Sequence, residues 1–112
     1  MSDCLFCAIV AGAIPSTRVL ETDRVLAFRD IAPQAPTHVV VVPKEHFTDT
    51  ADLARRDPAQ LAEVLRAAVE VAEQEGLSGG YRILTNTGPD SGQTVFHLHV
   101  HVLGGKAMGP LA

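Results

Sequence analysis

The chain has 112 residues, of which 46% are hydrophobic and 20% charged, and its formal net charge is −4 at pH 7. These values indicate one globular domain over residues 1–112 and exclude a disordered chain. They also give no electrostatic case for nucleic-acid binding, which is typical of proteins with a basic patch. No apolar run approaches the ~20 residues of a membrane span, and the N-terminus lacks the features of a signal peptide. We therefore expect a cytoplasmic protein that binds no membrane.

The first half of the chain predicts one short helix and three strands. An apolar stretch at residues 4–11 is long enough for about two helical turns. Gly12 and Pro15 end it. Residues 17–21 and 25–31 are predicted to form a hairpin, because residues 21–24 supply turn chemistry. Residues 38–43 include four consecutive valines, which predict a strand buried on both faces.

The second half predicts one long helix and two more strands. Residues 48–53 predict a single turn, and Asp57-Pro58 predicts a helix start with the aspartate as cap. This helix should run to about Gln74 and stop at Gly76. Residues 81–85 predict a strand and residues 88–92 a tight loop. The expected core-facing positions of the helix recur at three and four: Leu61, Val64, Leu65, Ala68, Val71 and Ala72.

Three of the five histidines stand at every second position, as His97, His99 and His101, with leucine and valine between them. Strict alternation predicts a strand with a histidine face and a buried aliphatic face. A polar surface strand is the alternative, but histidine is a poor choice for solubility alone. With this fifth strand, the chain predicts an α+β fold: a five-stranded antiparallel sheet with one long and one short helix.

A row of histidines with no carboxylate among them suits phosphoryl chemistry. A neutral imidazole is a good nucleophile near pH 7, and attack on phosphorus gives a phosphohistidine-type intermediate that water hydrolyses. Neighbouring histidines can donate hydrogen bonds to the phosphate oxygens, which gather charge in the transition state.

Several segments add to this pattern: Cys-Leu-Phe-Cys at residues 4–7, residues 30–38, residues 43–46, Asn86, and residues 92–96 leading into the histidines. Together they resemble the HIT (histidine triad) family and, within it, the Hint branch. The resemblance covers nearly the whole chain, including Leu103-Gly104-Gly105. It implies a HIT-like fold, a purine nucleotide substrate, and a homodimer that extends the sheet across a two-fold axis.

The resemblance also implies roles for the histidines. It makes His99 the nucleophile, and it gives His101 and His38 phosphate contact and proton management. For His38 alone, a hydrogen-bonded histidine at a strand end is an equally good interpretation. Thr94 stands where close Hint relatives carry serine. It keeps the hydroxyl that helps the leaving group depart, but its methyl group restricts its rotamers.

Other residues are expected to hold the nucleotide. The loop after Asn86 brings Gly92 and backbone N–H groups next to the histidines, and such a turn can cradle a phosphate. Asp30, at a strand end, can accept both ribose hydroxyls. By the resemblance, the base pocket is lined by the apolar residues Leu5, Phe6, Ile9, Phe28 and Ile31. Packing in the core is the alternative role for these residues, and for Ile9 it is an equally good interpretation.

Cys4 and Cys7 have the spacing that lets two thiolates bind one tetrahedral zinc ion. Alone, this spacing is weak evidence for a zinc site, because cysteines near a helix start are often core residues. A disulfide is a poor alternative, since i, i+3 positions rarely meet its dihedral requirements. The resemblance supplies His46 and His97 as the other two ligands. We expect a structural zinc ion and no organic cofactor; four protein ligands leave no open position for catalysis.

The predicted function is hydrolysis of the bond to the α-phosphate of purine nucleoside phosphoramidates or related nucleotidyl compounds, through a nucleotidyl-histidine intermediate. One alternative is a dinucleoside polyphosphate hydrolase, against which Leu103-Gly104-Gly105 argues. The other is a non-enzymatic nucleotide-binding or regulatory module, against which the intact histidine set with Asn86 argues. The C-terminal residues 108–112 lack the tryptophan of the best-known Hint proteins, so selectivity attributed to that tail does not carry over.

Overall fold

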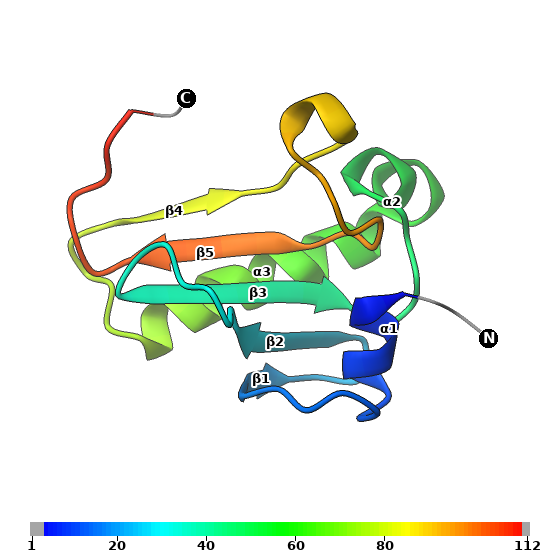
Figure 1. Cartoon of the computed structure of the whole chain (residues 1–112), viewed down its shortest axis with the longest axis horizontal. Helices are drawn as coiled ribbons and strands as arrows, with labels where there is room; N and C mark the ends of the chain where they lie inside the picture. The colour runs from blue at the N-terminus through cyan, green and yellow to red at the C-terminus, as the bar shows by residue number, and fades with distance from the viewer. Residues whose placement is uncertain (1–3, 111–112) are drawn as a thin grey trace.

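The computed structural model describes residues 4–110, so the two ends of the predicted domain 1–112 lie outside the described residues. Five antiparallel strands form one sheet in the order β1-β2-β3-β5-β4 (Figure 1). This confirms the predicted α+β fold. In chain order the elements are α1 (Leu5–Val10), β1 (Arg18–Glu21), β2 (Val25–Arg29), β3 (Thr37–Pro43), α2 (Thr50–Arg56), α3 (Pro58–Gln74), β4 (Tyr81–Leu84), the 3₁₀ turn η1 (Pro89–Ser91) and β5 (Val100–Gly104).

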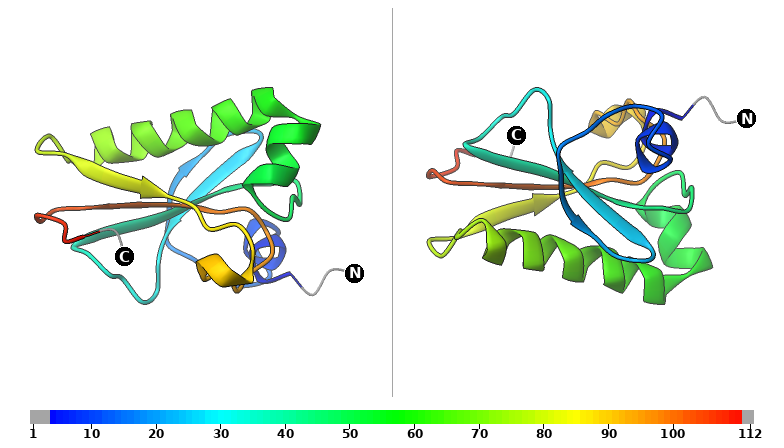
Figure 2. Two further views of the ribbon diagram at one scale, coloured as in Figure 1. Left: turned by 90° about the horizontal axis from the view of Figure 1, so that it is seen from above. Right: turned by 90° about the horizontal axis from the view of Figure 1, so that it is seen from below.

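The sheet separates two apolar layers. Figure 2 shows α3 lying along one face, while α1 and η1 lie on the other. Strand β3 is central, and its valines at positions 39–42 are at most 2% exposed, as the four-valine run predicted. The α3 face contains Val39, Val41, Val64, Ala68, Val71, Val100 and Val102, and the α1 face contains Phe6, Ile9, Leu26, Phe28, Val40 and Val42.

Helix α3 begins as predicted. The Asp57 carboxylate accepts a hydrogen bond from the backbone N–H of Gln60, and Pro58 occupies the first turn. The helix stops before Gly76, whose φ of 71° is a conformation that glycine adopts at little cost. One of the predicted core positions was wrong: Leu65 is 43% exposed, so it lies on the outer side of the helix.

Helix α2 is longer than the predicted single turn. The Asp49 side chain caps its first turn by accepting from the N–H of Asp52. Asp52 in turn pairs with Arg56 at 2.8 Å, an i, i+4 ion pair that supports the second turn. The expected single turn ended too early because it took neither this cap nor this ion pair into account.

The histidine strand is shorter than predicted. Strand β5 starts at Val100, so His97 and His99 precede it in irregular backbone. The partner strand β3 ends at Pro43, which has no N–H to donate, and the N–H of Leu98 donates instead to the carbonyl of Phe47. The alternation of faces continues all the same, with Leu98 in the α3 layer and the histidines on the α1 side. Within residues 4–110, no helix is long and apolar enough to cross a membrane.

Candidate active site and metal-binding cluster

The backbone fixes the tautomer of His99. Its Nδ1 lies 2.8 Å from the carbonyl oxygen of His97. A carbonyl oxygen only accepts, so Nδ1 carries the proton and Nε2 carries the lone pair. Burial lowers the pKa of His99, which keeps the ring neutral at pH 7. The edge of the Phe6 ring packs against it at 4.9 Å between centroids. His99 thus has the lone pair and the fixed orientation that a nucleophile needs.

His38 and His101 form a directed hydrogen-bond chain across β3 and β5. The N–H of Gln34 donates to His38 Nδ1 at 3.0 Å, so the proton of a neutral His38 is on Nε2. That nitrogen lies 2.8 Å from His101 Nδ1 and 3.4 Å from Asp30 Oδ2. His38 therefore donates to His101, whose own proton is on Nε2. The chain therefore fixes His101 Nε2–H as a hydrogen-bond donor.

His101 is neutral at physiological pH. Burial, together with the neighbouring His99 and His38, lowers its pKa to about 4. Its ring lies 5.1 Å from that of His99 between centroids. A neutral imidazole with its proton on Nε2 is a hydrogen-bond donor beside the nucleophile.

The ligand atoms of Asp30, His38 and His101 lie within 4.8 Å of one another, a spacing at which three groups can hold a metal ion. The hydrogen bond from Gln34 argues against this use. It occupies the lone pair on His38 Nδ1 and places a proton on Nε2, the nitrogen that faces the cluster. We therefore interpret these three residues as a group that orients His101 and not as metal ligands.

A pocket of about 290 Å³ opens between α1 and the end of β2. The structure brings the five predicted base-contacting residues to it, with Asp30 beside them. Phe6, Ile9 and Phe28 are also core residues, whereas Ile31 is 99% exposed at the rim. The sequence analysis missed the remaining lining residues: Ile14, Pro15, Ser16, Arg29 and Val40.

The loop between Asn86 and Thr94 is held in shape by Gln93, which the sequence analysis also missed. Its side chain is 3% exposed, accepts from the N–H of Gly88 at 2.8 Å and donates to the carbonyl of Thr48 at 2.8 Å. Gly92 has a φ of 101°, a conformation that favours glycine. Asn86 is half-buried and Thr94 exposed. The sequence signal that could have pointed to Gln93 was a glutamine directly after a glycine in a loop.

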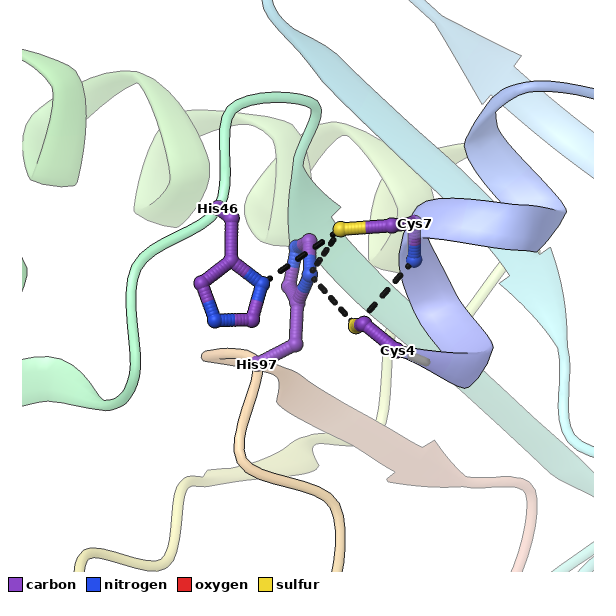
Figure 3. Close-up of side chains that lie close together, drawn as sticks. All are labelled: Cys4, Cys7, His46 and His97. Carbon is purple, nitrogen blue, oxygen red and sulfur yellow. Dashed lines mark hydrogen bonds between the residues drawn. The ribbon is translucent and has the colours of Figure 1, made fainter. Parts of the chain in front are cut away.

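The predicted zinc ligands come together from three segments (Figure 3). His97 Nδ1 lies 3.2 Å from Cys4 Sγ and 3.4 Å from Cys7 Sγ, and His46 Nδ1 lies 3.4 Å from Cys7 Sγ. The four ligand atoms all lie within 4.8 Å of one another. Tetrahedral zinc with ordinary bond lengths needs sulfur–nitrogen separations of about 3.6 Å. The donor set and its spacing therefore fit a zinc ion.

The orientation of His97 also fits metal binding. Its Nε2–H donates to the carbonyl oxygen of Pro43 at 2.8 Å, which leaves the lone pair on Nδ1 facing the two cysteines. The side chain is fully buried, and burial lowers its pKa to about 4. A metal-binding histidine needs such a hydrogen bond on its second nitrogen and a neutral ring.

The chain and its fold have close counterparts among known proteins. The HIT domain profile matches residues 11–108. The chain therefore belongs to the HIT (histidine triad) family. It is 41% identical over 108 residues to the purine nucleoside phosphoramidase of Escherichia coli K12, covering 96% of this chain and 91% of that one.

Two further relatives match along most of their length. The 14 kDa zinc-binding protein of Zea mays is 48% identical over 109 residues, which is 96% of this chain and 85% of that protein. The solved structure of a HIT family hydrolase from Clostridium thermocellum superposes with a TM-score of 0.93 at 45% identity, covering 98% of this chain and 96% of the other.

Proposed function

We propose that this protein hydrolyses the bond to the α-phosphate of purine nucleoside phosphoramidates or related nucleotidyl compounds. The observation that carries the proposal is the hydrogen bond from His99 Nδ1 to the His97 carbonyl, which leaves Nε2 as a nucleophile beside the neutral donor His101. The name of the E. coli relative, purine nucleoside phosphoramidase, supports this choice of substrate class.

In the proposed first step, His99 Nε2 attacks the α-phosphorus and the phosphorus–nitrogen bond to the leaving amine breaks. The amine takes its proton from a water, which becomes hydroxide. His101 Nε2–H donates a hydrogen bond to a phosphate oxygen, and His38 Nε2–H keeps His101 in that tautomer through His101 Nδ1. The Asp30 carboxylate, 3.4 Å from His38 Nε2, favours the state in which that nitrogen keeps its proton.

In the second step, a water attacks the same phosphorus and the bond to His99 Nε2 breaks, which releases a nucleoside monophosphate. The hydroxide formed in the first step takes the proton of the attacking water, so the site regains its starting state. The phosphate is proposed to lie against the 86–92 loop, with Asn86, Gly92 and Thr94 in contact. Asp30 would accept the ribose hydroxyls, and the base would fill the pocket between Phe6 and Phe28.

The four-residue cluster is proposed to hold a structural zinc ion through Cys4, Cys7, His46 and His97. The ion would cross-link α1 to the segment that carries the histidines, and with four protein ligands it has no position open for substrate. Support comes from the Nδ1 lone pair of His97 and from the zinc-binding relative in maize.

A second copy of the chain is the proposed protein partner. Strand β4 is an edge strand, and edge strands offer unpaired backbone groups to another chain. Strand β4 also exposes two apolar side chains, Tyr81 at 39% and Ile83 at 36%. A two-fold pairing of β4 would continue the sheet and bring these side chains close to the partner.

The experiment that tests the proposed activity compares kcat/KM for adenosine 5′-phosphoramidate with that for a diadenosine polyphosphate. We expect a clear preference for the phosphoramidate. A preference for the polyphosphate would favour the sister hydrolase reaction, and binding of AMP without turnover of either compound would favour the non-enzymatic alternative.

A further inference from the structure

Ser16 carries a polar atom that the fold itself does not use. Its Oγ is buried and has no hydrogen-bond partner, and it is the one side-chain nitrogen or oxygen in this condition among residues 4–110. Buried hydroxyl groups are nearly always hydrogen-bonded, because an unpaired one costs about 1–3 kcal/mol. Alanine would avoid this cost, so the hydroxyl calls for an explanation outside the packing of the chain.

The position of Ser16 supplies one. The residue lines the pocket that holds Phe6, Ile9 and Phe28, where the base is proposed to bind. It also lines an adjoining hollow of about 360 Å³, together with Asp30 and Ile31. Ser16 thus stands in the wall between the two hollows, beside the residue proposed to bind ribose.

The rest of that pocket is poor in side chains able to read a base. Most of its lining is apolar, and the two charged side chains are already engaged. Arg29 forms a two-bond pair with Glu75 at 2.8 and 3.0 Å, and Asp30 accepts from the N–H of Ala32 and faces His38. Apolar walls hold a base by its faces and do not distinguish its polar edge.

We propose that Ser16 is a specificity-determining residue whose hydroxyl turns about χ1 into the pocket and hydrogen-bonds a polar group on the edge of the bound purine. This inference rests on the proposed function. No hydrogen bond holds the oxygen in its present position, so the rotation breaks none. A hydroxyl both donates and accepts, so ring nitrogens, amino groups and oxo groups are all suitable partners.

The proposal makes two opposite predictions for Ser16→Ala. The free protein should melt at the same temperature as the wild type or higher, because an unpaired buried hydroxyl is removed. AMP or GMP should nevertheless bind about three- to tenfold more weakly, the range for one lost neutral hydrogen bond. A merely structural serine would move stability and binding in the same direction.

The test measures dissociation constants by titration calorimetry for AMP and GMP. The same constants are measured for analogues that lack one polar group of the base, namely the 7-deaza and 3-deaza nucleotides and purine riboside 5′-monophosphate. Ribose 5-phosphate, which has no base, is the third kind of ligand. Ser16→Ala should weaken at least one natural nucleotide and lose its effect on the analogue that lacks the contacted group. Ribose 5-phosphate should bind both forms equally. Ser78→Ala, at an exposed serine outside the site, is the matched control.

An equal loss for ribose 5-phosphate, or less than a twofold change for every nucleotide, would overturn the role of Ser16. The proposed function would survive that result if Asp30→Ala still weakened AMP relative to its 2′,3′-dideoxy analogue. If the wild-type protein bound none of the nucleotides, the proposed function and this inference would fail together.

Discussion

His97 and His99 are two positions apart and both are neutral, the first fully buried and the second half-buried, yet their free lone pairs lie in different surroundings. In His97 the Nε2–H donates to the Pro43 carbonyl, so the lone pair on Nδ1 faces two cysteines. In His99 the Nδ1–H donates to the His97 carbonyl, so the lone pair is on Nε2. In both residues a backbone carbonyl determines which ring nitrogen keeps a lone pair that can bind a metal ion or attack phosphorus.

The two sites are also mechanically joined. The carbonyl that orients His99 belongs to His97, and the ring of Phe6, between Cys4 and Cys7 in sequence, packs against both histidine rings at 6.0 and 4.9 Å. The proposed zinc ion would therefore stiffen the segment that orients the proposed nucleophile, without taking part in the reaction.

The largest expected effect comes from His99→Ala. Loss of the nucleophile should lower kcat for adenosine 5′-phosphoramidate by at least about 10³-fold. Zinc content, melting temperature and AMP binding should stay close to wild type, since the variant leaves the metal cluster and the base pocket intact. Turnover within tenfold of wild type would remove His99 from the nucleophile role.

His101→Ala should be slower than wild type but active. A donor that acts on transition-state charge is worth about 2–4 kcal/mol, which corresponds to roughly 30- to 1000-fold in kcat. His101→Gln keeps a donor and should recover part of the loss. If both variants fell to the level of His99→Ala, the division between attacking and donating histidines would be wrong.

Changes in the metal cluster should show the reverse pattern to His99→Ala. Metal analysis of the wild type should find about one zinc ion per chain. The double variant Cys4→Ser/Cys7→Ser and the variant His97→Ala should each lose it. Their melting temperatures should fall by about 5 °C or more, as expected for the loss of at least 1 kcal/mol. His97→Ala keeps the carbonyl that orients His99, so some turnover should remain. Unchanged melting temperatures with no zinc in the wild type would contradict the metal site.

The smallest expected effect is on the pH profile. The pKa of His101 is lowered from 6.5 to about 4, by burial first and then by His99 and His38, with Asp30 opposing. The kcat/KM should therefore stay level as the pH falls through 6.5 and decline only near 5 or below. Between pH 6.5 and 4 the unfolded chain binds a proton that folded His101 does not, so this residue lowers stability as the pH falls. An activity midpoint near 6.5 would show an unperturbed histidine instead.

Much of the architecture was predictable from residue patterns. The valine run predicted β3, Asp57-Pro58 predicted the start of α3, and the alternating histidines predicted that these side chains share one face. The grouping of Cys4 and Cys7 with two distant histidines needed the family resemblance, because no local spacing joins residues so far apart in the chain.

Other features were not predictable, for a common physical reason: they depend on backbone groups. The tautomers of His97, His99 and His38 are set by two carbonyls and by the N–H of Gln34, and such groups are the same in every residue. The late start of β5 follows from the missing N–H of Pro43 at the end of its partner strand, which can be recognised only once the register is known.

The assignment of His99 as the nucleophile is tested most directly by identifying the covalent intermediate. Wild-type protein is mixed with excess adenosine 5′-phosphoramidate, quenched within milliseconds, digested without acid and analysed by mass spectrometry. We expect an adenylyl group on His99 alone in the wild type, and no adenylyl group in the His99→Ala variant. An adenylyl group on His97, His101 or His38 would contradict the assignment of the free lone pair to His99 Nε2.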